Sequence, residues 1–145
     1  MCKPAVKCVL LADRHHGLTE GIRGLLETAF DVVIMVADAK SLFEGAKRIQ
    51  PALAVMELSL SGNDGFNLLR TLRSRCPGLK VIVLSMQDEP TLVRSVLEAG
   101  ADGYVLKSDI GTDLFSAVEA VLAGKSYVSP KVPLDPTAKS APEKE

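Results

Sequence analysis

The stretch LEAGADGYVLKSDIGTDLFSAVEAVLAGKSYVSP, residues 97–130, carries the pattern that decides the fold. A short apolar run at residues 103–106 is followed by an amphipathic stretch at 112–123. Apolar residues recur in that stretch at i, i+4, i+7 and i+8, as in a helix docked on a sheet: Leu114, Val118, Val121 and Leu122. Gly100 and Gly124 follow the last apolar turns of two helical patterns, where a left-handed cap favours glycine. The stretch therefore predicts a strand with a capped helix on either side.

The same alternation of strand and helix occurs five times along the chain. The apolar runs predicted to be strands are residues 6–12, 32–37, 53–56, 81–85 and 103–106. The helical patterns lie at residues 18–28, 41–49, 65–75, 91–99 and 112–123. This repeat is typical of an α/β protein with a parallel sheet. Because most of the runs are apolar throughout, we expect a doubly wound sheet that helices bury on both sides.

Length and composition predict one folded domain and a tail. The chain has 145 residues, of which 47% are hydrophobic and 24% charged, and this balance favours a compact domain over a disordered chain. From residue 129 the character changes, because four prolines arrive among Lys, Ser and Glu: Pro130, Pro133, Pro136 and Pro142. We therefore predict a domain over residues 1–128 and a proline-rich linker or disordered tail over 129–145.

Charge and cysteine content exclude several classes of function. The net charge is −1 and the basic residues are scattered, so the chain lacks the basic stripe that binds a phosphate backbone. We find no secretory signal and no 18-residue apolar run, so we expect no membrane association. The odd set of Cys2, Cys8 and Cys76 shows no CxxC spacing, which favours a reducing cytoplasm and structural roles for Cys8 and Cys76.

Polar residues close the predicted strands, at the edge where α/β proteins of this kind bind ligands. The first strand ends in Asp13, Arg14 and His15, and the third ends in Glu57. The fourth ends in Ser85, and the fifth contains Tyr104 and ends in Lys107. As a set, these polar groups predict a functional site at the carboxyl edge of the sheet.

With these residues the chain resembles a response-regulator receiver domain over roughly residues 6–128, of the class found in LuxR-type (NarL/FixJ-like) transcription regulators. The stretches that carry the resemblance are VLLADRHHGLTEGIRGLL at 9–26, PALAVMELSLSGNDGFNLL at 51–69, VIVLSMQDE at 81–89 and residues 97–130. The resemblance implies a flavodoxin-like, five-stranded parallel sheet of order 2-1-3-4-5. It also implies a non-enzymatic signalling protein that exchanges signals with a histidine kinase and other proteins.

The resemblance also assigns a role to each strand-end residue. In the family, an aspartate ending the third strand accepts a phosphoryl group, and Mg²⁺ is held by that aspartate and an acidic pair ending the first strand. Here the acceptor position is Glu57 and the acidic pair is Asp13 and Arg14. Ser85 and Lys107 match the hydroxyl and the lysine that contact the phosphate, and the Tyr104 position rotates with activation together with the Ser85 position.

Two of these positions depart from the pattern of the family. Arg14 is always protonated and only donates hydrogen bonds, so it repels the cation that an acid would bind there. Glu57 is longer than aspartate by one methylene, which displaces the carboxylate in a reaction that depends on positioning. We therefore expect Mg²⁺ binding to be lost or weak, and we expect Arg14 and Lys107 to share the carboxylates of Asp13 and Glu57. A partial imitation of the activated state by Glu57 is the competing interpretation.

Each of these residues also has a plainer interpretation. Arg14 can point to solvent, Ser85 can be a small polar strand end, and Tyr104 can be a half-buried aromatic residue at the sheet edge. His15 and His16 are adjacent, and adjacent residues rarely converge on one metal ion. The Gly-Asn-Asp-Gly run at 62–65 predicts a turn and not a phosphate loop.

Three functional hypotheses follow from the sequence. The first is an atypical receiver that signals without phosphorylation through protein contacts of its helices, including homodimer formation, with DNA bound only by a domain beyond residue 145. The second is a working phosphoacceptor that uses Glu57, Asp64 or Asp13. The third is a small-molecule sensor whose ligand occupies the altered pocket.

Overall fold

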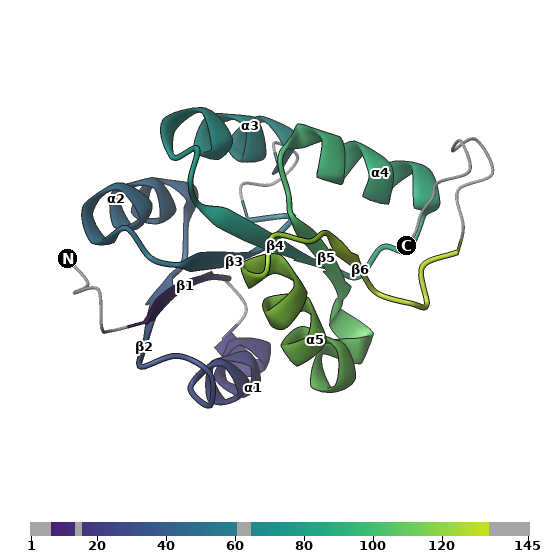
Figure 1. Ribbon diagram of the computed structural model, residues 1–145, viewed down its shortest axis with the longest axis horizontal. Coiled ribbons are helices and arrows are strands. Elements are labelled where there is room, and N and C mark those ends of the chain that lie inside the picture. The colour runs from purple at the N-terminus through teal and green to yellow at the C-terminus, as the bar shows by residue number, and fades with distance from the viewer. Residues whose placement is uncertain (1–6, 14–15, 61–64, 134–145) are drawn as a thin grey trace.

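The computed structural model describes residues 7–13, 16–60 and 65–133, with the backbone alone for residues 16–19. Six strands form one parallel sheet: β1 (Cys8–Ala12), β2 (Val32–Val36), β3 (Leu53–Glu57), β4 (Lys80–Ser85), β5 (Gly103–Leu106) and β6 (Tyr127–Val128). Their order is β2-β1-β3-β4-β5-β6. The predicted order of five strands is confirmed, and the two-residue β6 is added at the edge beside β5 (Figure 1).

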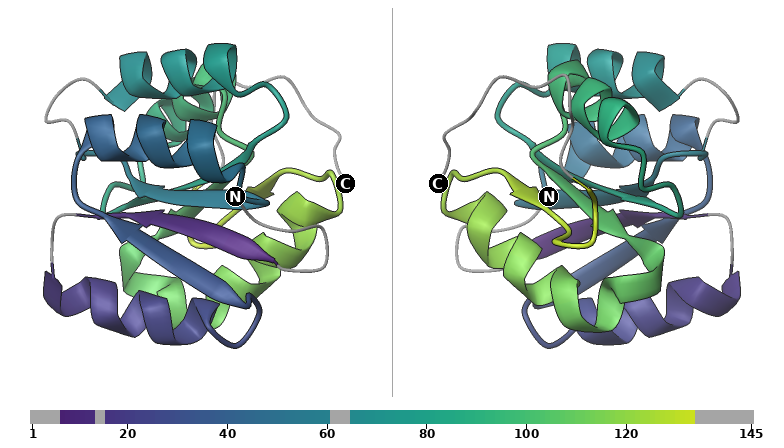
Figure 2. Two further views of the ribbon diagram at one scale, coloured as in Figure 1. Left: turned by 90° about the vertical axis from the view of Figure 1, so that its left-hand side faces the viewer. Right: turned by 90° about the vertical axis from the view of Figure 1, so that its right-hand side faces the viewer.

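Helices cover the sheet on both faces. They are α1 (His16–Leu26), α2 (Ala39–Ile49), α3 (Gly65–Arg75), α4 (Pro90–Ala99) and α5 (Ile110–Leu122), with a short 3-10 helix η1 (Lys107–Asp109) before α5. α2, α3 and α4 lie on one face, and α1 and α5 on the other (Figures 1 and 2). Two apolar cores result, and neighbouring strand residues point into different ones: Leu10 and Tyr104 into the first, Leu11 and Val105 into the second.

The prediction that the sheet is buried on both sides holds for the central strands and is wrong for β2. All residues of β1, β3 and β5 are buried. In β2, however, Val32 is 39% exposed and Met35 36% exposed. β2 is an edge strand, so an apolar sequence there reflects packing on one neighbour, β1, and partial cover by helices.

The predicted glycine caps are confirmed by backbone geometry. Gly100 has φ of 130° and Gly124 has φ of 88°, values that side-chain-bearing residues rarely adopt. A Cβ atom at Gly100 would also lie 3.2 Å from Cβ of Arg73, so that helix end packs closely on α3.

The chain beyond β6 stays at the sheet edge as far as the structure follows it. Ser129 is 1% exposed, and Val132 packs against the core beneath α3 and α4. The predicted start of a tail at residue 129 stays a prediction, and residues 134–145 lie outside the described part of the chain. Among the described residues, no helix combines the length and the apolar character needed to cross a membrane.

Candidate functional site at the carboxyl edge of the sheet

Parallel pairing brings the ends of four strands to one edge of the sheet. Ala12 lies beside Met56, Glu57 beside Leu84, and Ser85 beside Leu106. The residues that end or follow these strands are therefore neighbours: Asp13, Glu57, Ser85 and Lys107. Asp13 and Glu57 are each 4% exposed and Ser85 is 5% exposed. The structure thus brings four of the predicted site residues together where almost no solvent reaches them.

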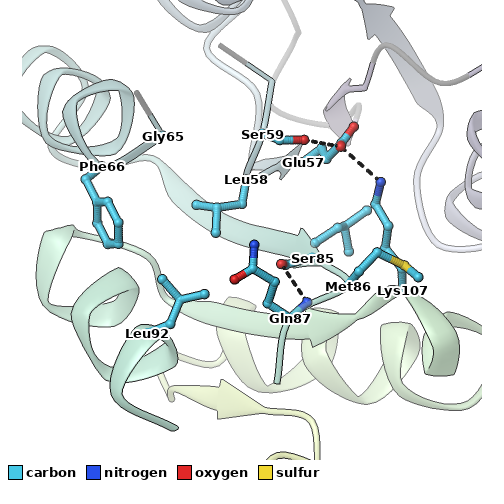
Figure 3. Close-up of a pocket in the computed structure, with 11 residues that line it drawn as sticks. Glu57, Leu58, Ser59, Gly65, Phe66, Ser85, Met86, Gln87, Leu92 and Lys107 are labelled. Carbon is cyan, nitrogen blue, oxygen red and sulfur yellow. Dashed lines mark hydrogen bonds and ion pairs between the residues drawn. The ribbon is translucent and has the colours of Figure 1, made fainter. Parts of the chain in front are cut away.

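Lys107 is the cation at the centre of this cluster. Its Nζ lies 3.3 Å from Glu57 Oε2 (Figure 3). The same Nζ lies 4.0 Å from Asp13 Oδ2, and the Lys107 side chain is 7% exposed. The predicted sharing of both carboxylates by Lys107 is therefore present. Attraction between such charges is much stronger than in water, because little solvent screens them. The predicted contribution of Arg14 lies outside the described residues, as do His15 and the side chain of His16.

Ser59 is a site residue that the sequence did not suggest. It lies two residues beyond the end of β3, in a turn closed by the hydrogen bond from Leu60 N to Glu57 O at 3.1 Å. Its hydroxyl donates to Glu57 Oε2, the same oxygen that faces Lys107 (Figure 3). One carboxylate oxygen thus accepts a hydroxyl and faces an ammonium. A serine two positions after the acceptor position was the signal that could have revealed this contact.

Ser85 and Tyr104 hold the backbone of Gln87 from two directions. Gln87 N donates to Ser85 Oγ at 3.1 Å, and the Tyr104 hydroxyl donates to Gln87 O at 2.7 Å. Tyr104 is fully buried, so the alternative of a half-buried aromatic residue is wrong for it. Burial raises the pKa of Tyr104, the Asp88 charge raises it further, and a hydrogen bond with Ser85 opposes both. The segment that follows β4 is thereby tied to β5.

A cleft of about 320 Å³ opens beside the charged cluster. Its polar wall contains Glu57, Ser59, Ser85, Gln87 and Lys107. Its apolar wall is built from the loop after β3, the first turns of α3 and α4, and the segment after β4: Leu58, Phe66, Leu92 and Met86 (Figure 3). Met86 is 74% exposed, so the apolar wall extends to the rim of the cleft.

The donor set here fits Mg²⁺ poorly. Within the described ranges, no group of three or more His, Cys, Asp and Glu side chains could hold a metal ion. The two carboxylates present, Asp13 and Glu57, both lie within 4.0 Å of the Lys107 ammonium. A second cation, Arg14, follows Asp13 directly in the sequence. A dication would therefore share its ligands with fixed positive charges. Residues 62–64 of the predicted turn, including Asp64, lie outside the described residues. The last residue of that run, Gly65, begins α3.

The family model for the response regulator receiver domain matches residues 9–119, so the chain belongs to that family. The transcriptional regulatory protein DegU of Brevibacillus brevis is 33% identical over 126 residues, which cover 86% of this chain and 53% of DegU. RcsB of Escherichia coli strain K12 is 31% identical over 129 residues, which cover 86% of this chain and 60% of RcsB. The chain thus spans little more than half the length of these curated relatives, which are named as transcription regulators and not as enzymes.

Solved structures agree with this assignment. A LuxR-family two-component response regulator from Aurantimonas sp. SI85-9A1 superposes with a TM-score of 0.80 at 30% identity, covering 88% of this chain and 93% of that chain. The isolated receiver domain of RcsB from Salmonella enterica serovar Typhimurium in the apo form gives a TM-score of 0.77 at 29% identity, covering 86% of this chain and 93% of that one. The chain therefore has the receiver fold with LuxR-family neighbours.

Proposed function

We propose that this chain is the regulatory receiver module of a LuxR-type transcription regulator in the cytoplasm, and that it signals through protein contacts without being phosphorylated. The observation that carries the proposal is Glu57, a glutamate at the acceptor position, whose Oε2 accepts from Ser59 and lies 3.3 Å from Lys107. A carboxylate held in this way is displaced from the place where an aspartate would attack phosphorus, and its charge is already balanced.

The arrangement of Tyr104 supports the same proposal. Its ring is buried and its hydroxyl is bonded to Gln87 O. In the family, this position moves together with the Ser85 position when phosphate is present. Ser85 accepts from Gln87 N, so Ser85 and Tyr104 together hold the segment after β4. We infer that partners recognise the module without a phosphoryl group at Glu57.

The α1–α5 side is our candidate surface for homodimer formation. Phe115 and Leu122 are 39% and 41% exposed on α5, and they share one face of that helix because they are seven residues apart. RcsB has been solved as dimers bound to DNA, and we propose that this chain also forms dimers, through these α5 residues. DNA binding would belong to a segment beyond this chain, since its relatives are longer and its own charge is −1.

A charge placed on this face tests the dimer. In Phe115→Glu, a glutamate would have to be buried in the interface, so we expect the dimer to dissociate at least tenfold more readily. Size-exclusion chromatography with light scattering over a dilution series measures the change. Met86→Glu is the control, because it places the same charge at a more exposed apolar residue on another surface. A wild-type chain that is monomeric at every concentration would remove this part of the proposal.

Phosphorylation is tested directly by incubating the protein with acetyl phosphate and Mg²⁺ and measuring its intact mass. We expect no phosphoryl adduct. The double variant Arg14→Asp with Glu57→Asp restores the acidic pattern of the family, and an adduct on it would show that the assay detects acyl phosphates in this fold. An adduct on the wild-type chain, whether on Glu57, Asp64 or Asp13, would establish a working phosphoacceptor instead.

The cleft supports a second candidate function, a sensor for a small molecule. Its apolar wall and its polar wall offer both burial and orientation to a ligand of modest size. Thermal melting across a panel of metabolites tests this candidate, because a ligand that binds only the folded state raises the melting temperature. A reproducible shift that disappears in Phe66→Ala would favour the sensor over the protein-contact module. A panel without any shift would remove it.

A further inference from the structure

Residues 127–132 follow α5 and run beside β5, the strand that leads into the site. β6 pairs in parallel with β5, with Tyr127 beside Gly103 and Val128 beside Tyr104. Val128 and Val132 both pack against the core that contains Tyr104. The segment after α5 is therefore held against β5, the strand that carries Tyr104. We call this segment the clamp.

Ser129 is the tightest point of the clamp. Its backbone N donates to Tyr104 O at 2.9 Å, and its Oγ accepts from Leu106 N at 2.9 Å. The hydroxyl thus takes the place that a carbonyl of a longer β6 would occupy, and it continues the ladder by one hydrogen bond. Ser129 O also accepts from Val132 N at 3.0 Å, which closes a turn around it. With 1% of its surface exposed, Ser129 has no water to replace these partners.

Lys131 attaches the far end of the clamp to η1. Its Nζ lies 3.1 Å from Asp109 Oδ1, and the side chains of Lys131 and Asp109 are 75% and 10% exposed. Asp109 Oδ2 is buried and has no hydrogen-bond partner among the described residues. The lysine therefore supplies the charge that this buried carboxylate needs, although its own side chain is mostly in solvent. An attachment of this kind holds the segment and can still be released.

The anchors of the clamp and the charged site share one short stretch of backbone. The clamp binds Tyr104, Leu106 and Asp109, while the site uses Tyr104 and Lys107. Moving Lys107 or Tyr104 displaces the backbone groups to which Ser129 is bonded. We propose that docking of the clamp is coupled to the state of the Lys107–Glu57 site, so that the site controls how firmly the outgoing chain is held. The proposal needs no particular signal at the site, and it is independent of whether phosphate is used.

Coupling of this kind acts in both directions. Loosening the clamp has to alter the surroundings of Gln87 and Lys107, because Tyr104 joins the two regions through its carbonyl and its hydroxyl. Changing the site has to alter protection of the clamp amides. If the clamp had a purely structural role, loosening it would leave the surroundings of Gln87 and Lys107 unchanged, and changing the site would leave the clamp amides unchanged.

The test is amide hydrogen exchange followed by NMR on the 145-residue chain. In Ser129→Ala, the Leu106 amide loses its acceptor, and we expect exchange at Leu106 and Val132 to accelerate on the order of tenfold. We also expect the amide of Gln87, whose carbonyl is bonded to the Tyr104 hydroxyl, to change its exchange rate and chemical shift. Ser95→Ala is the matched control, since that hydroxyl donates to Thr91 O within α4, on its exposed side. Unchanged Gln87 signals in a loosened clamp would overturn the proposal.

Further variants test whether a change at the site reaches the clamp, and they keep the proposal testable if Ser129→Ala fails to fold. Glu57→Gln changes the site alone, and it should alter amide exchange at Leu106 and Ser129. Glu44→Gln, at an exposed residue of α2, is the control and should leave both amides unchanged. Lys131→Gln acts at a solvent-exposed side chain and should loosen Val132, with Lys131→Arg restoring protection. If Glu57→Gln leaves every clamp amide unchanged, the coupling does not exist, whatever the outcome of the phosphorylation assay.

Discussion

Among the described residues, Arg73 at one end of the sheet and Lys107 at the other are cations surrounded by oxygen acceptors, but they are bound in different ways. At the amino end, Arg73 donates five hydrogen bonds: to Pro77 O, to Leu79 O, twice to Gly100 O, and to Asp102 Oδ2. At the carboxyl end, Lys107 faces two carboxylates at 3.3 Å and 4.0 Å. Arg73 is the more exposed of the two, with 30% of its side-chain surface in solvent against 7% for Lys107.

The difference teaches how a receiver divides rigidity from adjustability. A guanidinium is a planar fork with donors in fixed directions, so Arg73 fixes the relative positions of α3, the start of β4 and the end of α4. An ammonium on a flexible stem is a point charge, and small movements change its distances to Asp13 and Glu57 at little geometric cost. The amino end therefore behaves as a fastener, and the carboxyl end can respond to a change in charge.

The largest effect expected from this comparison is that of Arg73→Ala. The substitution removes the Arg73 donor from three backbone carbonyls and from Asp102 Oδ2, which keeps only Val81 N, and we expect a loss of about 2–3 kcal/mol in the free energy of unfolding. Urea denaturation measures the loss. Arg48→Ala, at an exposed residue in the last turn of α2, is the control and should change stability by less than about 0.5 kcal/mol. Equal effects of the two substitutions would refute the role of Arg73 as a fastener.

Tyr104→Phe has a smaller effect that depends on pH. Losing the hydroxyl removes the hydrogen bond to Gln87 O, at a cost of about 1 kcal/mol at neutral pH. Burial raises the pKa of Tyr104 above its ordinary value of 10.0, so the folded state keeps this proton longer than the unfolded state does. That contribution is fully present below pH 10.0 and is lost as pH rises through the folded-state pKa.

Denaturation at several alkaline pH values measures this contribution. The wild-type chain should lose stability more steeply above pH 10.0 than Tyr104→Phe does. Tyr127→Phe is the control, because it leaves the Tyr104 contribution in place. The pKa of Tyr127 is also raised, first by burial and then by Asp113, but the Tyr127 side chain is partly exposed. Parallel pH profiles for wild type and Tyr104→Phe would contradict the assigned cause.

Particular residues show what the sequence could predict and what it could not. The strands and the glycine caps follow from local pattern, because a run such as Val9 to Leu11 between helical stretches leaves few alternatives. Proximity of Asp13, Glu57 and Lys107 follows from parallel topology. The sequence could not single out Arg73 from Arg70 and Arg75 in the same helix, because the choice depends on where the Gly100 and Leu79 carbonyls lie after folding.

Side chains that act over short loops were missed for a similar reason. Ser59 and Ser129 are small polar residues near turns; the place of Ser59 two residues after Glu57 is a weak signal, and nothing in its immediate sequence distinguishes Ser129 from a solvated serine. Their roles depend on oxygen and nitrogen atoms of other segments, namely Glu57 Oε2 and Leu106 N. The exposure of Val32 and Met35 was missed as well, because an apolar run has the same pattern at the edge of a sheet as at its centre.

The smallest effect expected is that of Glu57→Gln, and it separates the two ends of the sheet most sharply. The substitution keeps the shape of the side chain and leaves Lys107 with Asp13 as its carboxylate, so one buried charge and its desolvation cost disappear together. We expect stability to change by no more than about 1 kcal/mol, in either direction.

The matched change at the amino end, Asp102→Asn, should cost about 1–2 kcal/mol, because Asp102 Oδ2 accepts from both Arg73 and Val81 N. Urea denaturation of both variants decides the point. If Glu57→Gln proved the more damaging of the two, the carboxyl end would be the fastener and the adjustable site would lie elsewhere.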